Sequence, residues 1–201
     1  MPSSDYFAQL GLFFVKGFLD AQSCARLRSE MRSSIHTPAT VVAKGVSLEQ
    51  ESARRTKWAE VSEESLSNVE TRLLDAMPLL ANHFNLPLTG YDKPQFLVYK
   101  AGDFYRAHQD RDDGPVTPEY IQKRRVSVVV FLNGNARNSE PGSYDGGALT
   151  FYGLMDDQRW QRFGLPLVSE EGLLVAFPSK TLHEVSAVTR GDRYTIVSWF
   201  F

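Results

Sequence analysis

The chain has 201 residues, of which 42% are hydrophobic and 12% aromatic, so we expect one folded domain spanning residues 1–201 rather than a disordered chain or two independent domains. The formal net charge is only −2 and no block of Lys or Arg stands out, so we expect neither a nucleic-acid nor a membrane partner. Cys24 is the only cysteine, which excludes an internal disulfide. The sequence shows no signal-peptide pattern and no apolar run of roughly 20 residues, so we expect a cytoplasmic protein.

Residues 1–92 are predicted to form mainly helical support and loop. Asp20 and Ser62 can each cap a helix, because their side chains accept hydrogen bonds from backbone amides, and apolar residues recur at helical spacing after both. Pro78 should kink or interrupt the second helix. Between the helices, residues 36–58 show little periodicity and are predicted to be a loop. The predicted buried stripes are Cys24, Leu27, Met31 and Ile35, then Leu66, Val69, Leu73, Met77, Leu80 and Phe84.

Residues 93–201 change to short alternating runs that are rich in β-branched and aromatic residues. Gly, Asn, Pro and Asp separate these runs, and no long helical pattern intervenes, which is typical of an antiparallel sandwich or barrel. The predicted fold class is α+β, mainly β, with a double-stranded β-helix (jelly-roll) core buttressed by the N-terminal helices. The predicted strands lie in QFLVYK, FYRAHQD, RRVSVVVFLNG, GGALTFYG, GLLVAFP and DRYTIVSWFF.

Chemistry-bearing residues lie in two of these runs. His108 and Asp110 are two residues apart, so strand alternation would put both side chains on one face, although a solvated surface pair would show the same spacing. His183, in LLVAFPSKTLHEV, supplies a second imidazole. Two histidines and one carboxylate form the facial triad that binds non-haem iron(II), whereas a structural zinc site usually has four ligands, commonly cysteines. We therefore predict an iron site.

Arg193 begins the last predicted strand and would share a face with Thr195, Val197 and Trp199. A guanidinium that points inward can bind a carboxylate in bidentate fashion. The alternative is an exposed arginine at the start of a strand.

An ordered series of motifs extends over about half of the chain and resembles the prolyl 4-hydroxylase group of the Fe(II)/2-oxoglutarate-dependent dioxygenases. The motifs are Tyr99-Lys100-Ala101-Gly102, Tyr105-x-x-His108-x-Asp110, Phe131-Leu132-Asn133, Gly146-Gly147-Ala148-Leu149-Thr150-Phe151, Phe177-Pro178, His183-Glu184-Val185 and Gly191-x-Arg193-Tyr194 with Trp199.

The resemblance implies that His108, Asp110 and His183 ligate iron and that 2-oxoglutarate chelates the metal. It further implies that Arg193 binds the distal carboxylate of 2-oxoglutarate and that Tyr99 lines the cosubstrate pocket. By the same resemblance, several family members have a tyrosine at the position of Phe131, so one hydroxyl donor is missing here.

By the same matching, Tyr105, Arg124 and Trp199 fall where family members approach the substrate. Tyr99 and Trp199 could instead be ordinary core aromatics, and Arg124 the solvated end of a strand. His36 and His83 are interpreted as structural or surface residues.

The implied function is hydroxylation of a substrate C–H bond by O2, with release of succinate and CO2. Ascorbate is an optional reductant. A prolyl residue of a protein or peptide is the expected target. The alternatives are hydroxylation of a free amino acid or small metabolite, and a non-catalytic jelly-roll metal sensor or interaction module. Residues 37–57 and 111–123 are predicted to be substrate-facing loops.

Overall fold

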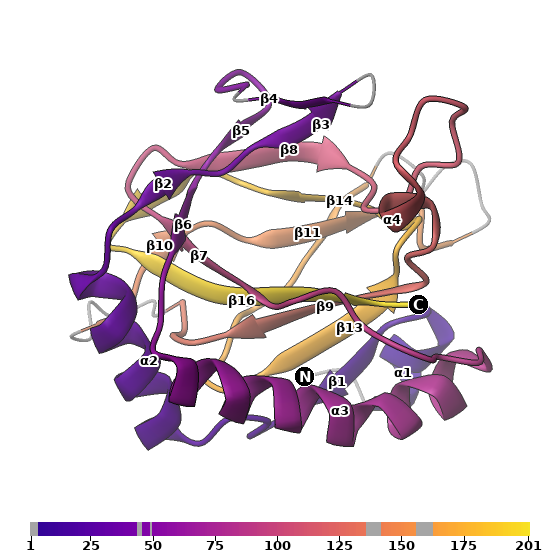
Figure 1. Ribbon diagram of the computed structural model, residues 1–201, viewed down its shortest axis with the longest axis horizontal. Coiled ribbons are helices and arrows are strands. Elements are labelled where there is room, and N and C mark those ends of the chain that lie inside the picture. The colour runs from indigo at the N-terminus through magenta and orange to yellow at the C-terminus, as the bar shows by residue number, and fades with distance from the viewer. Residues whose placement is uncertain (1–3, 44–45, 49, 136–141, 156–162) are drawn as a thin grey trace.

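The computed structural model describes residues 4–43, 46–48, 50–135, 142–155 and 163–201. Two long helices lie along one side of a large sheet, and a smaller sheet lies on the other side of it (Figure 1). The predicted mainly-β α+β class is confirmed.

Helix α2 (Ala21–Ser33) begins where the Asp20 carboxylate accepts a hydrogen bond from the backbone N–H of Ser23 at 2.7 Å. This bond satisfies one of the unpaired amides of the first turn. Ile35 was predicted to continue the buried stripe, and that prediction is wrong. The helix ends at Ser33, and the extended backbone of Ser34 turns the chain away, so Ile35 is 77% exposed. The remaining stripe is confirmed as buried: Cys24, Leu27 and Met31.

Helix α3 (Glu63–Phe84) begins at Ser62, whose hydroxyl accepts from the Ser65 amide at 3.2 Å. Pro78 lies inside the helix without interrupting it. The helix ends at Asn85, which adopts a left-handed conformation with φ 50°. Its predicted stripe faces the core, with Val69, Leu73 and Leu80 buried and Leu66, Met77 and Phe84 partly buried.

The described strands form two main sheets, in which the described pairings are antiparallel. The large sheet has the order β1 (Phe13–Val15), β13 (Leu174–Pro178), β9 (Val126–Phe131), β16 (Arg193–Phe200), β7 (Gln95–Tyr99), β6 (Lys57–Ala59) and β2 (Thr37–Pro38). The small sheet has the order β12 (Leu165–Pro166), β11 (Leu149–Tyr152), β14 (Leu182–Val185), β8 (Phe104–His108) and β5 (Arg54–Arg55).

Four further strands form two-stranded pairs, and two short helices complete the described elements. The pairs are β10 (Asp145–Gly146) with β15 (Val188–Arg190), and β3 (Val41–Ala43) with β4 (Val46–Leu48). The short helices are α1 (Ser4–Gln9) and α4 (Glu119–Gln122).

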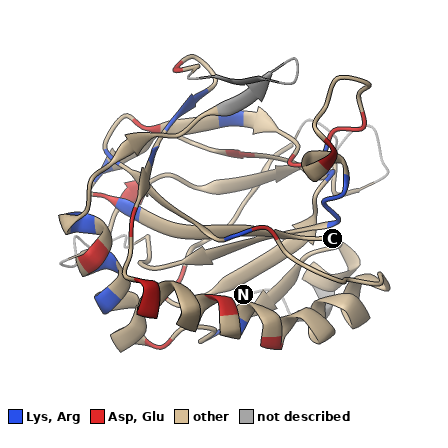
Figure 2. Ribbon diagram, viewed as in Figure 1, with Lys and Arg blue, Asp and Glu red and all other residues tan. Residues whose placement is uncertain are grey.

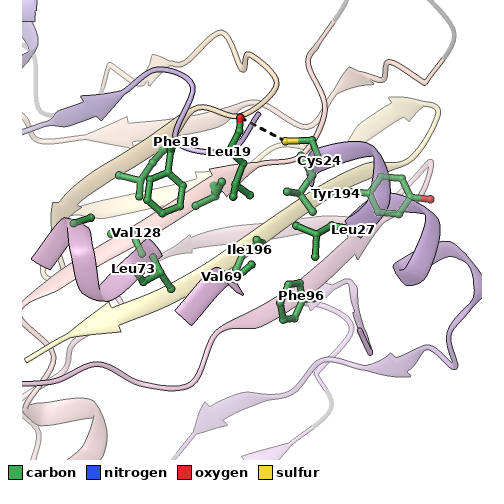
Figure 3. Packing of buried hydrophobic residues seen from close by; sticks show 14 of the residues in the cluster. Phe18, Leu19, Cys24, Leu27, Val69, Leu73, Phe96, Val128, Tyr194 and Ile196 are labelled. Carbon is green, nitrogen blue, oxygen red and sulfur yellow. Dashed lines mark hydrogen bonds between the residues drawn. The ribbon is translucent and has the colours of Figure 1, made fainter. Parts of the chain in front are cut away.

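The large sheet is buried on both faces, as strand β9 illustrates. Val128 and Val130 pack toward α2 and α3 in one apolar cluster (Figure 3). Val129 and Phe131 pack toward the small sheet in a second cluster. Because successive strand residues point to opposite faces, a strand covered on both sides reads as an unbroken apolar run, as VVVF does at residues 128–131. This double coverage holds the wall that carries Arg193 in place.

The prediction that residues 36–58 form a loop is wrong. In its described part, β2 and β6 extend the large sheet, β5 forms an edge of the small sheet, and β3 pairs with β4. These strands are only two or three residues long, so they carry no periodicity, and β5 and β6 are stabilised by β8 and β7, which are distant in the sequence. Residues 44–45 and 49 lie outside the described residues.

The described surface agrees with the small net charge, since Lys and Arg are interspersed with Asp and Glu over helices and connections (Figure 2). None of the helices in the described part of the chain is long and apolar enough to cross a bilayer.

Cys24 provides a probe of this core. Its side chain is fully buried, and burial raises the pKa of the thiol to about 12, so almost no reactive thiolate exists in the folded chain. We expect alkylation at neutral pH to be at least about a hundredfold slower in buffer than in denaturant. Over a series of urea concentrations, the rise in Cys24 alkylation and the loss of the circular-dichroism signal should have the same midpoint. Fast, complete labelling of the folded protein would contradict this packing.

Candidate active site

Strands β8 and β14 bring two histidines together. The Cα atoms of His183 and His108 are direct cross-strand partners, although the two residues lie far apart in the sequence. Asp110 follows two residues after His108, just beyond the end of β8, and its backbone N–H donates to the Ser179 carbonyl at 2.9 Å. One potential ligand atom from each of the three residues lies within 4.8 Å of the others. The structure therefore brings together the predicted triad, with Asp110 placed by a turn rather than by strand alternation.

Both imidazoles are oriented by backbone carbonyls. The Nδ1 atom of His108 lies 2.8 Å from the Arg106 oxygen, and Nδ1 of His183 lies 2.9 Å from the Thr181 oxygen. A carbonyl only accepts, so each Nδ1 carries the proton and each Nε2 keeps a free lone pair. These Nε2 atoms lie 3.5 and 3.6 Å from the two oxygens of Asp110.

Burial and neighbouring groups set the charge states of His183 and Asp110. Burial lowers the pKa of His183 to about 4, so this imidazole is neutral at neutral pH, which is the form that binds metals. Burial alone would raise the pKa of Asp110, but the neighbouring His183 and His108 outweigh it and hold this pKa well below its usual range. An ionised Asp110 carboxylate beside the neutral His183 imidazole forms a site that favours a divalent cation.

A pocket of about 450 Å³ opens over the triad and is lined by residues of both sheets. This volume is typical of small-ligand sites. Arg193 lines its inner wall on β16 and is only 1% exposed, so the alternative of an exposed strand-start arginine is wrong. Its guanidinium lies 4.9 Å from the centre of the Tyr99 ring and 5.2 Å from that of Phe131.

The guanidinium of Arg193 is only partly satisfied. Nη1 donates to the Thr195 hydroxyl at 3.3 Å, whereas Nε and Nη2 are buried and have no hydrogen-bond partner among the described residues. Buried donors without partners are costly, and a guanidinium stays charged in proteins. The pocket wall therefore presents an unneutralised cation with two open donors, which suits a carboxylate.

Thr195 is a pocket residue that was not assigned from the sequence. It is fully buried, lines the pocket and stands opposite Phe131 in the pairing of β16 with β9. Its hydroxyl accepts from Arg193 and retains a proton to donate. The signal was available, because period-two alternation puts it on the face of Arg193. It offers a hydroxyl near the position where Phe131 lacks one.

The three residues predicted to approach the substrate all line the pocket. The Tyr105 ring stacks on His108 with centres 3.5 Å apart. Arg124 stacks on Trp199 at 3.7 Å and pairs with Asp92 at 2.9 Å. Arg124 is 9% exposed, so the alternative of a solvated strand end is wrong for it.

The other two histidines lie elsewhere. His36 Nε2 contacts the Met31 carbonyl at 2.7 Å, and His83 packs between Phe13 and Phe84. Neither belongs to the metal-binding group or to the pocket lining.

Both segments predicted to face the substrate contribute to the pocket. Residues 37–57 supply an arginine of β5 and neighbouring residues, and residues 111–123 supply part of α4 and the connection before it. The contributing residues are Thr40, Gln50, Ala53, Arg54, Asp112, Val116, Thr117, Tyr120 and Ile121.

Residues 94–201 match the profile of a family described as the 2OG-Fe(II) oxygenase superfamily. The chain belongs to this superfamily. The family prediction made from the motifs is thereby confirmed, and it rests on the same β region that carries the triad and Arg193.

Curated relatives point to one branch of the superfamily. A PKHD-type hydroxylase of Synechococcus sp. (strain JA-2-3B'a(2-13)) is 30% identical over 138 residues, which are 66% of this chain and 55% of the relative. The PKHD-type hydroxylase YbiX of Escherichia coli is 28% identical over 193 residues, which are 94% of this chain and 77% of the relative. The chain thus spans about half the length of the first of these relatives.

Solved structures share the fold. A Pseudomonas putida prolyl-4-hydroxylase aligns with TM-score 0.69 and 24% identity, covering 98% of this chain and 95% of that one. A prolyl hydroxylase from Trichoplax adhaerens, solved in complex with a hypoxia inducible factor peptide fragment, aligns with TM-score 0.69 and 21% identity, covering 98% and 86%.

The residues present suit the two groups that membership of the superfamily implies. His108, Asp110 and His183 supply the two-nitrogen, one-carboxylate donor set that favours iron(II), and the described group contains no fourth donor. The unpartnered donors of Arg193 suit one carboxylate of 2-oxoglutarate.

Removing any triad side chain should abolish metal binding, because three donors leave no spare protein ligand. Loss of outer-shell partners alone costs 10- to 100-fold in metal affinity, so we expect His108→Ala, Asp110→Ala and His183→Ala each to lose more than about a hundredfold. Isothermal titration with iron(II) under anaerobic conditions measures this. His36→Ala is the matched control and should bind normally. Near-normal iron affinity in His183→Ala would contradict the assignment.

The Arg193 site makes a separate prediction for 2-oxoglutarate. Removing one partner of a buried charge pair costs about 2 to 5 kcal/mol, so Arg193→Ala should weaken 2-oxoglutarate binding roughly thirtyfold or more. Thr195→Val removes only a hydroxyl and should cost about 1 kcal/mol, roughly fivefold.

Anaerobic titration of the iron-loaded variants with 2-oxoglutarate tests both values, and iron affinity should change little in either variant. Dissociation constants indistinguishable from wild type would show that neither side chain contacts the cosubstrate.

Proposed function

We propose that this protein is an iron(II)- and 2-oxoglutarate-dependent dioxygenase that hydroxylates a substrate C–H bond. One observation carries the proposal: the buried guanidinium of Arg193, with two unpartnered donors, opens into the same pocket as His108, Asp110 and His183. A non-catalytic metal sensor has no need of this unneutralised cation, so the observation favours an enzyme that binds an organic acid beside its metal.

The chain's own residues would bind, orient and shield the reactants. When bound together, iron(II), 2-oxoglutarate and O2 supply the oxidative decarboxylation that releases succinate and CO2 and transfers one oxygen atom to the substrate. His108, Asp110 and His183 would hold the metal. Arg193 and Thr195 would bind the distal carboxylate of 2-oxoglutarate, and the Tyr99 ring would form part of the wall around it. Ascorbate is a candidate reductant.

Tyr105 and Trp199 would exclude water from the reacting substrate atom. Burial raises the pKa of Tyr105 to about 12, so its hydroxyl stays protonated and can donate a hydrogen bond at neutral pH. Trp199 is held by its stack with Arg124. Rings fixed in this way form a preorganised wall rather than an adaptable one.

We interpret the two facing sheets as a double-stranded β-helix core in a single domain spanning residues 1–201. The pairing of β5 and β6 from the N-terminal part with β8 and β7 supports one domain, because it ties that part into both sheets. The cytoplasmic location stays a prediction from the sequence.

A prolyl residue of a protein or peptide is the substrate we favour. The aromatic walls formed by Tyr105 and Trp199 suit an apolar pyrrolidine ring. The solved prolyl hydroxylases with this fold, one of them with a bound peptide fragment, support the same choice. A free amino acid or small metabolite is the second candidate, since the fold does not determine the substrate.

Purified protein with iron(II), 2-oxoglutarate and O2 should form succinate, and a proline-containing peptide library should accelerate the reaction. Mass spectrometry should find a gain of one oxygen on proline. Arg193→Ala is the matched negative control, as it retains the metal ligands. Peptide-stimulated succinate without modified proline would refute the prolyl substrate, and no succinate at all would refute the dioxygenase.

A further inference from the structure

The pocket contains a second arginine with an unsatisfied donor. Arg54 lies on β5, the edge strand of the small sheet, directly across from Tyr105 on β8. Its side chain lines the pocket and is 9% exposed. Nη1 donates to the Thr40 carbonyl at 3.0 Å, but Nε is buried and has no hydrogen-bond partner in the part of the chain that the structure describes.

Arg54 also lacks a counter-charge. Among the described residues, no carboxylate oxygen lies within ion-pair distance of its guanidinium, whereas its neighbour Arg55 pairs with Glu51 at 3.8 Å on the exposed surface. The charge of Arg54 lies 4.7 Å from the Tyr105 ring centre. Such a cation–π contact stabilises the charge but leaves the N–H donors unsatisfied. A buried guanidinium in this state favours an anion from outside the chain.

The position of Arg54 places this anion beside the reacting centre. The Tyr105 ring contacts the Arg54 guanidinium and also stacks on His108 at 3.5 Å, so a single side chain connects Arg54 with the candidate metal ligand. Arg193, by contrast, lies on β16 of the opposite sheet. Of the arginines with a buried unpartnered donor, Arg54 and Arg193 line the pocket, and they lie on its opposite walls, which suits two separate acids.

The other charged residues of the pocket are already engaged. Arg124 pairs with Asp92 at 2.9 Å, and Arg106, whose Nε donates to the Ser52 carbonyl, is exposed, so water solvates its charge. Asp112 accepts from the hydroxyl of Thr117 within its own loop. Arg54 is thus the lining residue best placed to bind a further anion.

We propose that Arg54 binds a carboxylate of the substrate itself, and that this protein acts on carboxylate-bearing substrates. The proposal rests on the proposed function and deepens it. The carboxylate would come from an acidic residue next to the target proline of a peptide, or from the α-carboxylate of a free imino acid. In either case Arg54 is a specificity-determining residue that orients the ring over the triad.

Two probe pairs distinguish the sources of the carboxylate. N-acetyl-L-proline and N-acetyl-L-prolinamide differ only in the α-carboxylate, while acetyl-Pro-Glu-amide and acetyl-Pro-Gln-amide differ only in an acidic side chain. Each probe is titrated into the full chain loaded with 2-oxoglutarate and with zinc(II), which replaces iron(II) and does not support turnover. Binding is followed by calorimetry. In at least one pair, we expect the dissociation constant of the acid to be lower than that of its neutral partner by a factor of about ten or more.

The variants link this preference to Arg54. Arg54→Gln should remove the preference for the acid, and Arg54→Lys should retain part of it, because it keeps the charge but loses the fork of donors. Arg55→Gln, next to it on β5, should behave as wild type. All variants should bind 2-oxoglutarate normally, and protection of Cys24 from alkylation confirms that each is folded.

Three results would overturn the inference: equal binding of acid and amide in both pairs, no binding of either acid, or weakened 2-oxoglutarate binding in Arg54→Gln. If wild type forms succinate while the probes show no preference, this inference fails and the proposed function stands. If the preference is present but no succinate forms with any substrate, the proposed function fails instead.

Discussion

The antiparallel pairing of β14 with β8 is the contact on which the candidate site depends. It sets His183 opposite His108, and the carbonyls of Arg106 in β8 and of Thr181, just before β14, direct both Nε2 atoms toward Asp110. Behind His183 lies the ring of Phe177, with centres 4.8 Å apart, so packing between the sheets fixes the imidazole. A one-residue slip in this pairing would turn His183 out of the pocket, and the triad would be lost.

The second organising feature is the positive charge of two buried guanidinium groups, which no carboxylate of the described residues neutralises. Arg193 and Arg54 are both buried with unpartnered donors, while Arg124, in the same pocket, has Asp92 as a partner. Folding without ligands therefore carries an electrostatic cost that bound acids would relieve. This is typical of functional sites, where local stability is lower than packing would allow.

Much of the fold and site could be predicted from residue order, because local rules apply there. Caps and spacing located α2 and α3, and strand alternation placed Arg193 on an inward face. Structural features that depend on contacts between residues far apart in the sequence could not be predicted from these local rules. Residues 36–58 form strands too short to show a period, and Asp110 reaches the site through a turn held by Ser179. The open donor of Arg54 is visible only once β5 has paired with β8.

The proposed reaction would require the metal ligands His108, Asp110 and His183 together with Arg193, which would bind the 2-oxoglutarate that O2 oxidises. The most direct test is turnover under ¹⁸O₂, with mass spectrometry of the succinate and of the oxidised substrate. Incorporation of one labelled atom into succinate and one into the substrate is the predicted result, with much less of both products formed by Arg193→Ala when 2-oxoglutarate is held near its wild-type dissociation constant. Consumption of 2-oxoglutarate that leaves succinate unlabelled, or labelled succinate formed equally well by His183→Ala, would contradict the account.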